Sequence, residues 1–195
     1  MIPLPFTWPA LIPFWLAFYW TSIAELPFIR RDRVTAAARS DRWSLRVILV
    51  AGSIAMFLAF FFSTAFRQFS VVAARIPLYI TGIAGIVAAG WLRRHCFRML
   101  GASFTYDVRV HAGQVVVERG AYRFVRHPPY TAGMLLFGGI GAALTNWLSL
   151  AISIVLPAFA YAYRIRVEEE ALVSTLGSPY VDYMRRTRRL VPFLI

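Results

Sequence analysis

Lysine is absent from this chain of 195 residues: all 21 basic residues are arginine, and only nine residues are acidic. The resulting net charge of +12 is typical of nucleic-acid-binding proteins. The arginines form no basic face with interleaved aromatic side chains, because they lie in the gaps between long uncharged runs. We therefore exclude nucleic acid as a partner and interpret the arginines as flanking membrane segments.

Several motifs are missing as well. Cys96 is the lone cysteine, so the chain has neither an internal disulfide nor a CxxC metal or redox motif, and we predict no metal site. No GxGxxG loop is present, which argues against a soluble Rossmann methyltransferase. The N-terminus lacks the basic region of a secretory signal, so we expect its apolar stretch to stay in the membrane uncleaved.

What the chain has in abundance is apolar sequence, with 59% hydrophobic residues and a mean hydropathy of +0.60. A membrane-spanning helix takes roughly 20 apolar residues. Four uncharged or nearly uncharged regions have the required character, the first interrupted by Glu25 and Pro27: residues 11–29, 47–66, 76–92 and 128–163. The last is too long for one span, and Thr145-Asn146-Trp147 is its natural polar turn.

This pattern predicts an all-α integral membrane protein of about five transmembrane helices, with a C-terminal helical hairpin and short cytoplasmic helices. We expect one membrane domain over residues 1–195, in which residues 1–70 hold the first two helices and residues 76–195 the binding core. Small residues at Gly82, Gly85, Gly138 and Ala142 are expected to let helices approach closely.

The arginines predict the orientation. Nineteen of them fall in the segments 30–46, 93–126 and 164–189, and only Arg67 and Arg75 fall on the other side of the membrane. By the positive-inside rule these three segments face the cytoplasm and the N-terminus faces outward. We expect the chain in a bacterial inner membrane, among membrane lipids.

Short elements are predicted in the cytoplasmic segments. Alternation of apolar and polar residues over 106–117 favours an extended pair. Residues 165–176 have helix-forming composition, and Gly177 suits a C-cap. Ser178-Pro179 fits the N-cap and first position of a second short helix that runs to about Arg188.

The loop over residues 120–130 joins basic and aromatic side chains at the start of the long apolar hairpin. A purely structural interpretation makes Arg123 and Arg126 membrane anchors and Pro128 an ordinary first-turn proline. Alternatively, an arginine, His127 and two tyrosines at a helix N-terminus cradle an anionic or polar ligand. Polar groups at this depth are costly unless they have partners.

A second polar stretch, residues 164–172, directly follows the last span. At helical spacing Arg164 faces Glu168 and Arg166 faces Glu170, which predicts surface ion pairs of a few tenths of a kcal/mol. In the functional interpretation, Arg164 with Glu168 or Glu169 lies beside the His127 loop. Both ends of a tight helical hairpin emerge on the same side of the membrane, which favours that adjacency.

These residues carry a resemblance. The pattern GxYxxVRHPxY, then RxxxEE after the hairpin, then Leu-Gly-Ser-Pro-Tyr-Val-Asp-Tyr and a terminal Val-Pro-Phe resembles the isoprenylcysteine carboxyl methyltransferase family and related phospholipid methyltransferases. The resemblance covers residues 91–193. Pro129, where small residues are common, and Ala121, where proline is common, depart from the family pattern without removing a polar group.

The resemblance implies that S-adenosylmethionine binds on the cytoplasmic side, in a pocket formed by the last helices and the C-terminal segment, while a lipophilic acceptor enters from the bilayer. Arg93 and Arg164 match arginines near the reacting centre. The residues that match the cofactor site are Tyr122, His127, Pro128, Tyr130, Gly133, Glu168 and Glu169.

Methyl transfer from a sulfonium needs alignment and desolvation more than a strong base. Arginines hold a carboxylate acceptor well, whereas an amine or thiol acceptor needs a proton-accepting group. The sequence leaves open a prenylcysteine-like carboxylate, a phospholipid amine or a thiol. A helical membrane protein of this kind also fits a steroid-type reductase that uses NAD(P)H, or a non-catalytic scaffold.

Overall fold

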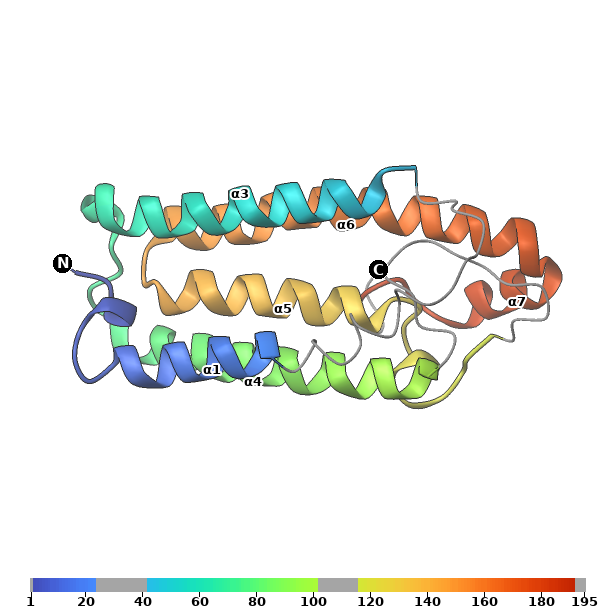
Figure 1. Ribbon diagram of the computed structural model, residues 1–195, viewed down its shortest axis with the longest axis horizontal. Helices are drawn as coiled ribbons and strands as arrows, with labels where there is room; N and C mark the ends of the chain where they lie inside the picture. The colour runs from blue at the N-terminus through green and yellow to red at the C-terminus, as the bar shows by residue number, and fades with distance from the viewer. Residues whose placement is uncertain (1, 24–41, 102–115, 192–195) are drawn as a thin grey trace.

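The computed structural model describes residues 2–23, 42–101 and 116–191. These form an all-helical bundle (Figure 1), as the apolar pattern predicted. In chain order the helices and 3-10 turns are η1 (Leu4–Phe6), α1 (Leu11–Ile23), α3 (Ser44–Ala65), η2 (Arg67–Phe69), α4 (Arg75–Leu100), η4 (Gly120–Arg123), α5 (Pro128–Ala143), α6 (Trp147–Leu176) and α7 (Ser178–Arg186).

A helix lies in each predicted span as far as the structure describes the chain, with lengths that differ from those predicted. Within the described residues, α3, α4 and α6 are long and apolar enough to cross a membrane, whereas α1 has 13 residues and α5 has 16. Helix α4 contains the predicted span 76–92 and extends beyond it, through Arg93 and Arg94 to Leu100. Likewise α6 does not stop at residue 163 but runs unbroken to Leu176. A charged residue ends an apolar run without ending a helix, since arginine is a good helix former.

The helices pack as neighbours in the order α1, α4, α5, α6 and α3 (Figure 1). The α5–α6 turn and η1 lie at one end of the bundle, and α7 and the start of α5 lie at the other. Arg67 and Arg75 belong to elements at the first end, η2 and the start of α4. The bundle end that carries α7 is therefore the arginine-rich one among the described residues, and it is called the polar end below.

Helices α4 and α5 approach closely through glycine. A Cβ on Gly82 would lie 2.5 Å from the backbone nitrogen of Ala143, and one on Gly139 would lie 2.8 Å from the carbonyl oxygen of Gly82. Gly82 was predicted to serve this packing. Gly138 was also predicted to do so, but its nearest neighbour is the Ile154 side chain at 3.9 Å, so the tight position lies one residue further along α5.

The turn between α5 and α6 lies where the polar triplet predicted it. Asn146 caps α6, because its side-chain oxygen accepts from Leu148 N at 3.0 Å and Ser149 N at 3.2 Å. Its amide nitrogen donates to the Phe66 carbonyl at 3.0 Å. The cap thus ties the hairpin to the end of α3 as well as starting α6.

The polar end is closed by the turn from α6 into α7. Gly177 has the predicted capping role, with φ of 63° and an N–H that donates to Val173 O at 3.0 Å. Gly177, rather than Ser178, also precedes α7 as its N-cap, and the helix ends at Arg186 rather than Arg188. The predicted extended pair falls mainly on residues 102–115, outside the described part of the chain.

Candidate functional site

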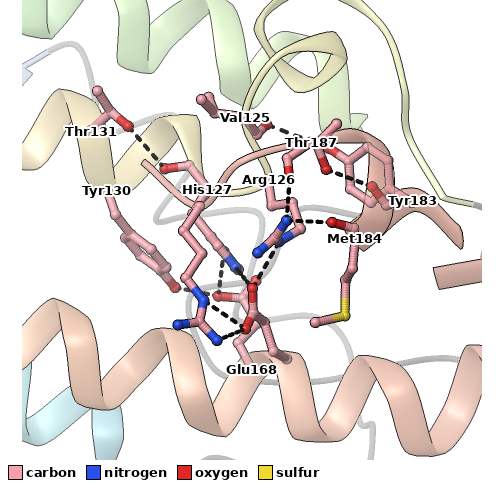
Figure 2. A network of polar contacts seen from close by, with 11 residues as sticks. Val125, Arg126, His127, Tyr130, Thr131, Glu168, Tyr183, Met184 and Thr187 are labelled. Carbon is pink, nitrogen blue, oxygen red and sulfur yellow. Dashed lines mark hydrogen bonds and ion pairs between the residues drawn. The ribbon is translucent and has the colours of Figure 1, made fainter. Parts of the chain in front are cut away.

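A polar cluster lies at the polar end, where the loop before α5 meets α6 and the chain after α7 (Figure 2). His127, Arg164 and Glu169 are each no more than 5% exposed. Buried charges are stable only when they are paired and hydrogen-bonded. The contacts of each side chain therefore show which charged groups already have all their partners within the protein.

The loop before α5 is held from two sides. Gly120 begins η4 with φ of 58°, and a Cβ there would lie 2.9 Å from Nε2 of His95 on α4. On the other side, the Tyr183 hydroxyl of α7 donates to the Tyr122 carbonyl at 2.6 Å. The loop is thus fixed between α4 and α7.

The chain after α7 returns along this loop. Arg126 N donates to Arg188 O at 2.7 Å, His127 N donates to Arg189 O at 3.0 Å, and Arg188 N donates to Phe124 O at 3.2 Å. These bonds make a parallel bridge between Val125 and Arg188. The Arg-His-Pro sequence and the arginines near the C-terminus therefore lie side by side.

Glu169 is the centre of the cluster. Its Oε1 accepts from Nε of Arg126 at 2.9 Å and lies 3.3 Å from Nε2 of His127. Its Oε2 accepts two bonds from Arg189, at 3.1 Å and 2.9 Å. Because both oxygens are occupied, this carboxylate joins α6 to the loop and to the C-terminal segment.

Arg126 completes the junction with its own backbone contacts. Its terminal nitrogen donates to the Met184 carbonyl at 3.0 Å and to the Thr187 carbonyl (Figure 2). These are the carbonyls at the end of α7, which have no partner within the helix. One guanidinium thus binds α6 and the end of α7 together.

Glu168 has a different environment. Its Oε2 accepts from the Tyr130 hydroxyl at 2.6 Å and lies 3.6 Å from Nδ1 of His127. No contact of Oε1 is found within the described part of the chain, and the side chain is 30% exposed. Glu168 therefore retains an open oxygen, whereas Glu169 does not.

Tyr130 links Glu168 to Arg164. Its hydroxyl accepts from Nε of Arg164 at 3.0 Å while it donates to Glu168. A terminal nitrogen of Arg164 donates to Ser44 Oγ on α3 at 2.7 Å. The charged end of Arg164 is thereby held between α5 and α3.

Aromatic rings line the same region. The rings of His127 and Tyr130 stack at 5.5 Å, and Tyr130 stacks on Tyr161 at 5.3 Å. Gly133 is required for this arrangement, because a Cβ there would lie 2.1 Å from the Tyr161 hydroxyl. Gly133 thus packs against Tyr161, and its place in the cofactor site stays a prediction.

Tyr122 is 6% exposed, and its hydroxyl has no hydrogen-bond partner in the described structure. Burial raises the pKa of the Tyr122 phenol well above its usual range, and Cys96 and Glu168 add to the effect. Burial also raises the pKa of Tyr183, to about 12. Both hydroxyls are therefore protonated donors at neutral pH, and that of Tyr122 is unused.

The structure brings most of the predicted site residues together. His127, Tyr130, Arg164, Glu168 and Glu169 form the connected cluster described above, and Tyr122 lies within electrostatic range of Glu168 and Tyr130. Pro128 is buried and starts α5. No group of three or more His, Cys, Asp or Glu side chains among the described residues is arranged to hold a metal.

Arg93 belongs to α4, on the other side of the loop before α5. Its guanidinium lies over the ring of Phe97 on the same helix, at 5.3 Å. Cys96 is within electrostatic range of both Arg93 and Tyr122, so the three groups lie near one another. The placement of Arg93 near the reacting centre stays a prediction.

The sequence interpretation missed the residues that complete the cluster. Arg126 was interpreted as a membrane anchor or, without being singled out, as an arginine of a ligand-binding loop; Arg189 was interpreted only as a topological charge, and Ser44 was not considered. The predicted surface pair of Arg166 with Glu170 gives way to a contact between Glu170 and Arg42, at 2.6 Å. Arg126 is the arginine of the VRHP part of the motif, so its role was within reach of sequence reasoning, whereas Ser44 gave no signal.

A family model described as phospholipid methyltransferase matches residues 77–178. Protein-S-isoprenylcysteine O-methyltransferase B of Arabidopsis thaliana is 31% identical over 116 residues, which cover 58% of each chain. The Saccharomyces cerevisiae protein-S-isoprenylcysteine O-methyltransferase is 28% identical over 59% of this chain and 49% of its own length. The chain thus spans about half the length of the curated relatives it matches.

A solved structure of the eukaryotic intramembrane Ras methyltransferase ICMT has a similar fold, with a TM-score of 0.60. The likeness covers 95% of this chain and 63% of that one, at 21% identity, and supports an all-helical membrane fold. The family match includes the loop before α5, the whole of α5 and α6, and Glu168 and Glu169. The chain therefore belongs to the phospholipid methyltransferase family, as its resemblance to isoprenylcysteine carboxyl methyltransferases and their phospholipid methyltransferase relatives predicted.

Proposed function

We propose that this protein is a membrane methyltransferase that uses S-adenosylmethionine to methylate a lipophilic acceptor. The observation that carries the proposal is that polar groups without a protein partner among the described residues lie beside Glu169, a carboxylate whose two oxygens are both hydrogen-bonded. Glu169 is fully engaged by the protein, while Glu168 keeps an open oxygen and Tyr122 an unpartnered donor in the part of the chain that the structure describes. Buried polar groups without partners are uncommon in folded proteins and indicate a ligand or a functional role.

The residues at the polar end fit the chemical groups of S-adenosylmethionine. Glu168 is suited to its cationic groups, and the Tyr122 hydroxyl is suited to an acceptor atom. The stacked rings of His127 and Tyr130 offer an aromatic surface to a planar base or a cation. Glu169, which was predicted to bind the cofactor directly, is assigned here to holding the other residues in place.

When bound, S-adenosylmethionine supplies an electrophilic methyl group on a sulfonium. The chain's own part is to bind, orient and exclude water, since such a displacement needs alignment more than a base. Arg164 is buried and held by Tyr130 and Ser44, so its planar guanidinium has a fixed direction. That suits a carboxylate acceptor, which an arginine recognises by geometry as well as by charge.

We propose a prenylcysteine-like carboxylate as the acceptor. The names of the relatives in Arabidopsis and yeast specify isoprenylcysteine O-methylation. An amine or a thiol acceptor requires a base to remove a proton. Glu169 is already occupied by arginines, and the other groups of the cluster that could accept a proton are Glu168, which we assign to the cofactor, and His127, which lies between the two glutamates. Family membership also favours methyl transfer over a reductase that uses NAD(P)H.

We propose further that the polar end faces the cytoplasm, because it carries the arginine-rich segments. Helix α6 supports a position at the membrane surface. Its 30 residues span about 45 Å, against about 30 Å of hydrocarbon, so roughly ten residues project beyond it. If its apolar start lies in the membrane, the projecting part begins near Arg164 and carries both glutamates.

The Tyr122 hydroxyl tests the cofactor site. Tyr122→Phe should lower S-adenosylmethionine affinity about tenfold, because one hydrogen bond is lost at a buried position. Titration calorimetry of the purified protein measures this, with Tyr19→Phe on the exposed face of α1 as the matched control. Unchanged affinity in a variant as stable as the parent would contradict the assignment, and binding of NADPH instead would favour the reductase.

Turnover tests the role of Arg164. Incubation with isotopically labelled S-adenosylmethionine and a prenylcysteine analogue should yield a labelled methyl ester. Arg164→Lys keeps the charge but loses the planar fork, so we expect about a hundredfold loss of turnover with little change in cofactor affinity. Arg166→Lys, an exposed position two residues away, is the control. Equal small effects at both positions would show that Arg164 serves packing at the polar end and does not orient the acceptor.

Cysteine labelling tests the orientation. Cys96 is buried, so single cysteines at the exposed positions Gln68 and Ser178 are distinguishable from it. A membrane-impermeant maleimide should label Gln68→Cys in intact cells and Ser178→Cys only after permeabilisation. The reverse pattern would place the polar end outside and overturn the proposed orientation.

A further inference from the structure

Helix α3 contributes a residue to the proposed site. Ser44 is its first residue, is fully buried, and accepts a hydrogen bond from Arg164 at 2.7 Å. The two residues are 120 positions apart in sequence. Ser44 also lies outside residues 77–178, the part that matches the family model.

The chain holds the start of α3 in an uncommon conformation. Arg42 and Trp43, which immediately precede Ser44, both have positive φ, 43° and 64°. This backbone region is unfavourable for residues other than glycine and asparagine, and it persists only where surrounding contacts enforce it. The strain therefore needs an opposing set of contacts.

Two of those contacts come from α6. The Tyr163 hydroxyl donates to the Arg42 carbonyl at 3.0 Å, and the Arg42 side chain contacts Glu170 at 2.6 Å. A third comes from α3 itself, where the guanidinium of Arg46 lies 4.0 Å from the centre of the Trp43 ring. The start of α3 is thus held to α6 on both sides of Arg164 in the sequence, by Tyr163 before it and by Glu170 after it.

We propose that Ser44 is a positioning residue that orients Arg164 for the acceptor, an inference that rests on the proposed methyl transfer. Arg164 binds Ser44 on α3 with one nitrogen and Tyr130 on α5 with another, and these contacts together fix the plane of its guanidinium. Through Tyr130 the guanidinium of Arg164 is connected to Glu168, which we assign to the cofactor. Ser44 holds the same guanidinium from α3, so in this proposal the N-terminal half of the chain helps to position the acceptor.

Ser44→Ala tests the proposal. Misplacement of an aligned group by about 1 Å costs on the order of a hundredfold in rate. We expect Ser44→Ala to lower kcat at least tenfold, while S-adenosylmethionine affinity stays within about twofold of the parent. Ser63→Ala is the matched control, because Ser63 is equally buried on α3 but donates to Phe60 of its own helix, at 2.8 Å.

Two further variants separate positioning from packing. Ser44→Cys keeps a small side chain at this position but provides a weak acceptor, so it should lose turnover as Ser44→Ala does. In an Arg164→Lys background, Ser44→Ala should have little additional effect, whereas independent losses would multiply. Full turnover of Ser44→Cys, or multiplying losses, would overturn the positioning role.

The methyl-transfer assay of the unmutated protein separates failure of the proposed function from failure of the proposed role of Ser44. Absence of a labelled methylated product (an ester, an N-methylamine or a thioether) with every lipophilic carboxylate, amine and thiol acceptor tested would overturn the proposed function, and the positioning role with it. Methyl transfer that Ser44→Ala leaves unchanged would overturn the positioning role alone. Methyl transfer reduced by Ser44→Ala but not by Ser63→Ala, with cofactor binding retained, would support both.

Discussion

The polar end of this bundle depends on one buried carboxylate. Glu169 is 5% exposed and binds Arg126, His127 and Arg189, which belong to the loop before α5 and to the chain after α7. A carboxylate this far from water is tolerated only with partners of opposite charge, and Arg126, which is almost as buried, in turn needs the carboxylate. That mutual requirement holds three segments of the chain in one place. Because Glu169 satisfies the arginines, its neighbour Glu168 is left open, and the proposed cofactor site follows from this division.

The membrane helices position this junction. Glycine at Gly82 and Gly139 brings α4 against α5, and the Asn146 cap fixes where α6 starts. Helix α6 then continues past the apolar run without a break, so Arg164, Glu168 and Glu169 stand on a rigid element rather than on a loop. Rigid elements hold functional groups more accurately than loops do. The left-handed residues Arg42 and Trp43 are the exception, and there the strain is balanced by contacts with Tyr163 and Glu170.

The sequence predicted what depends on local pattern. Apolar runs gave the helices, the Thr145-Asn146-Trp147 triplet gave the hairpin turn, and Gly177 gave the end of α6, since each is decided by a few adjacent residues. The motifs also identified most of the cluster. The division of labour between Glu168 and Glu169 was not predictable, because adjacent glutamates differ only in which partners the fold brings to them. Ser44 was invisible for the same reason: a single serine at the start of an apolar helix carries no pattern, and its partner is 120 residues away.

The thermal unfolding midpoint of Glu169→Gln, measured beside Glu170→Gln, tests the central role of this carboxylate most directly. Glu169→Gln leaves Arg126 and Arg189 without their anion, and both Glu169 and Arg126 are almost fully buried. Breaking a buried ion pair lowers the free energy of unfolding by about 3–5 kcal/mol. At about 2–4 °C per kcal/mol for a chain of this size, the midpoint should fall by on the order of 10 °C. Glu170 pairs with Arg42 in the open, where both side chains are more than half exposed, so Glu170→Gln should change the midpoint by only a few degrees. Equal small shifts in the two variants would contradict the account.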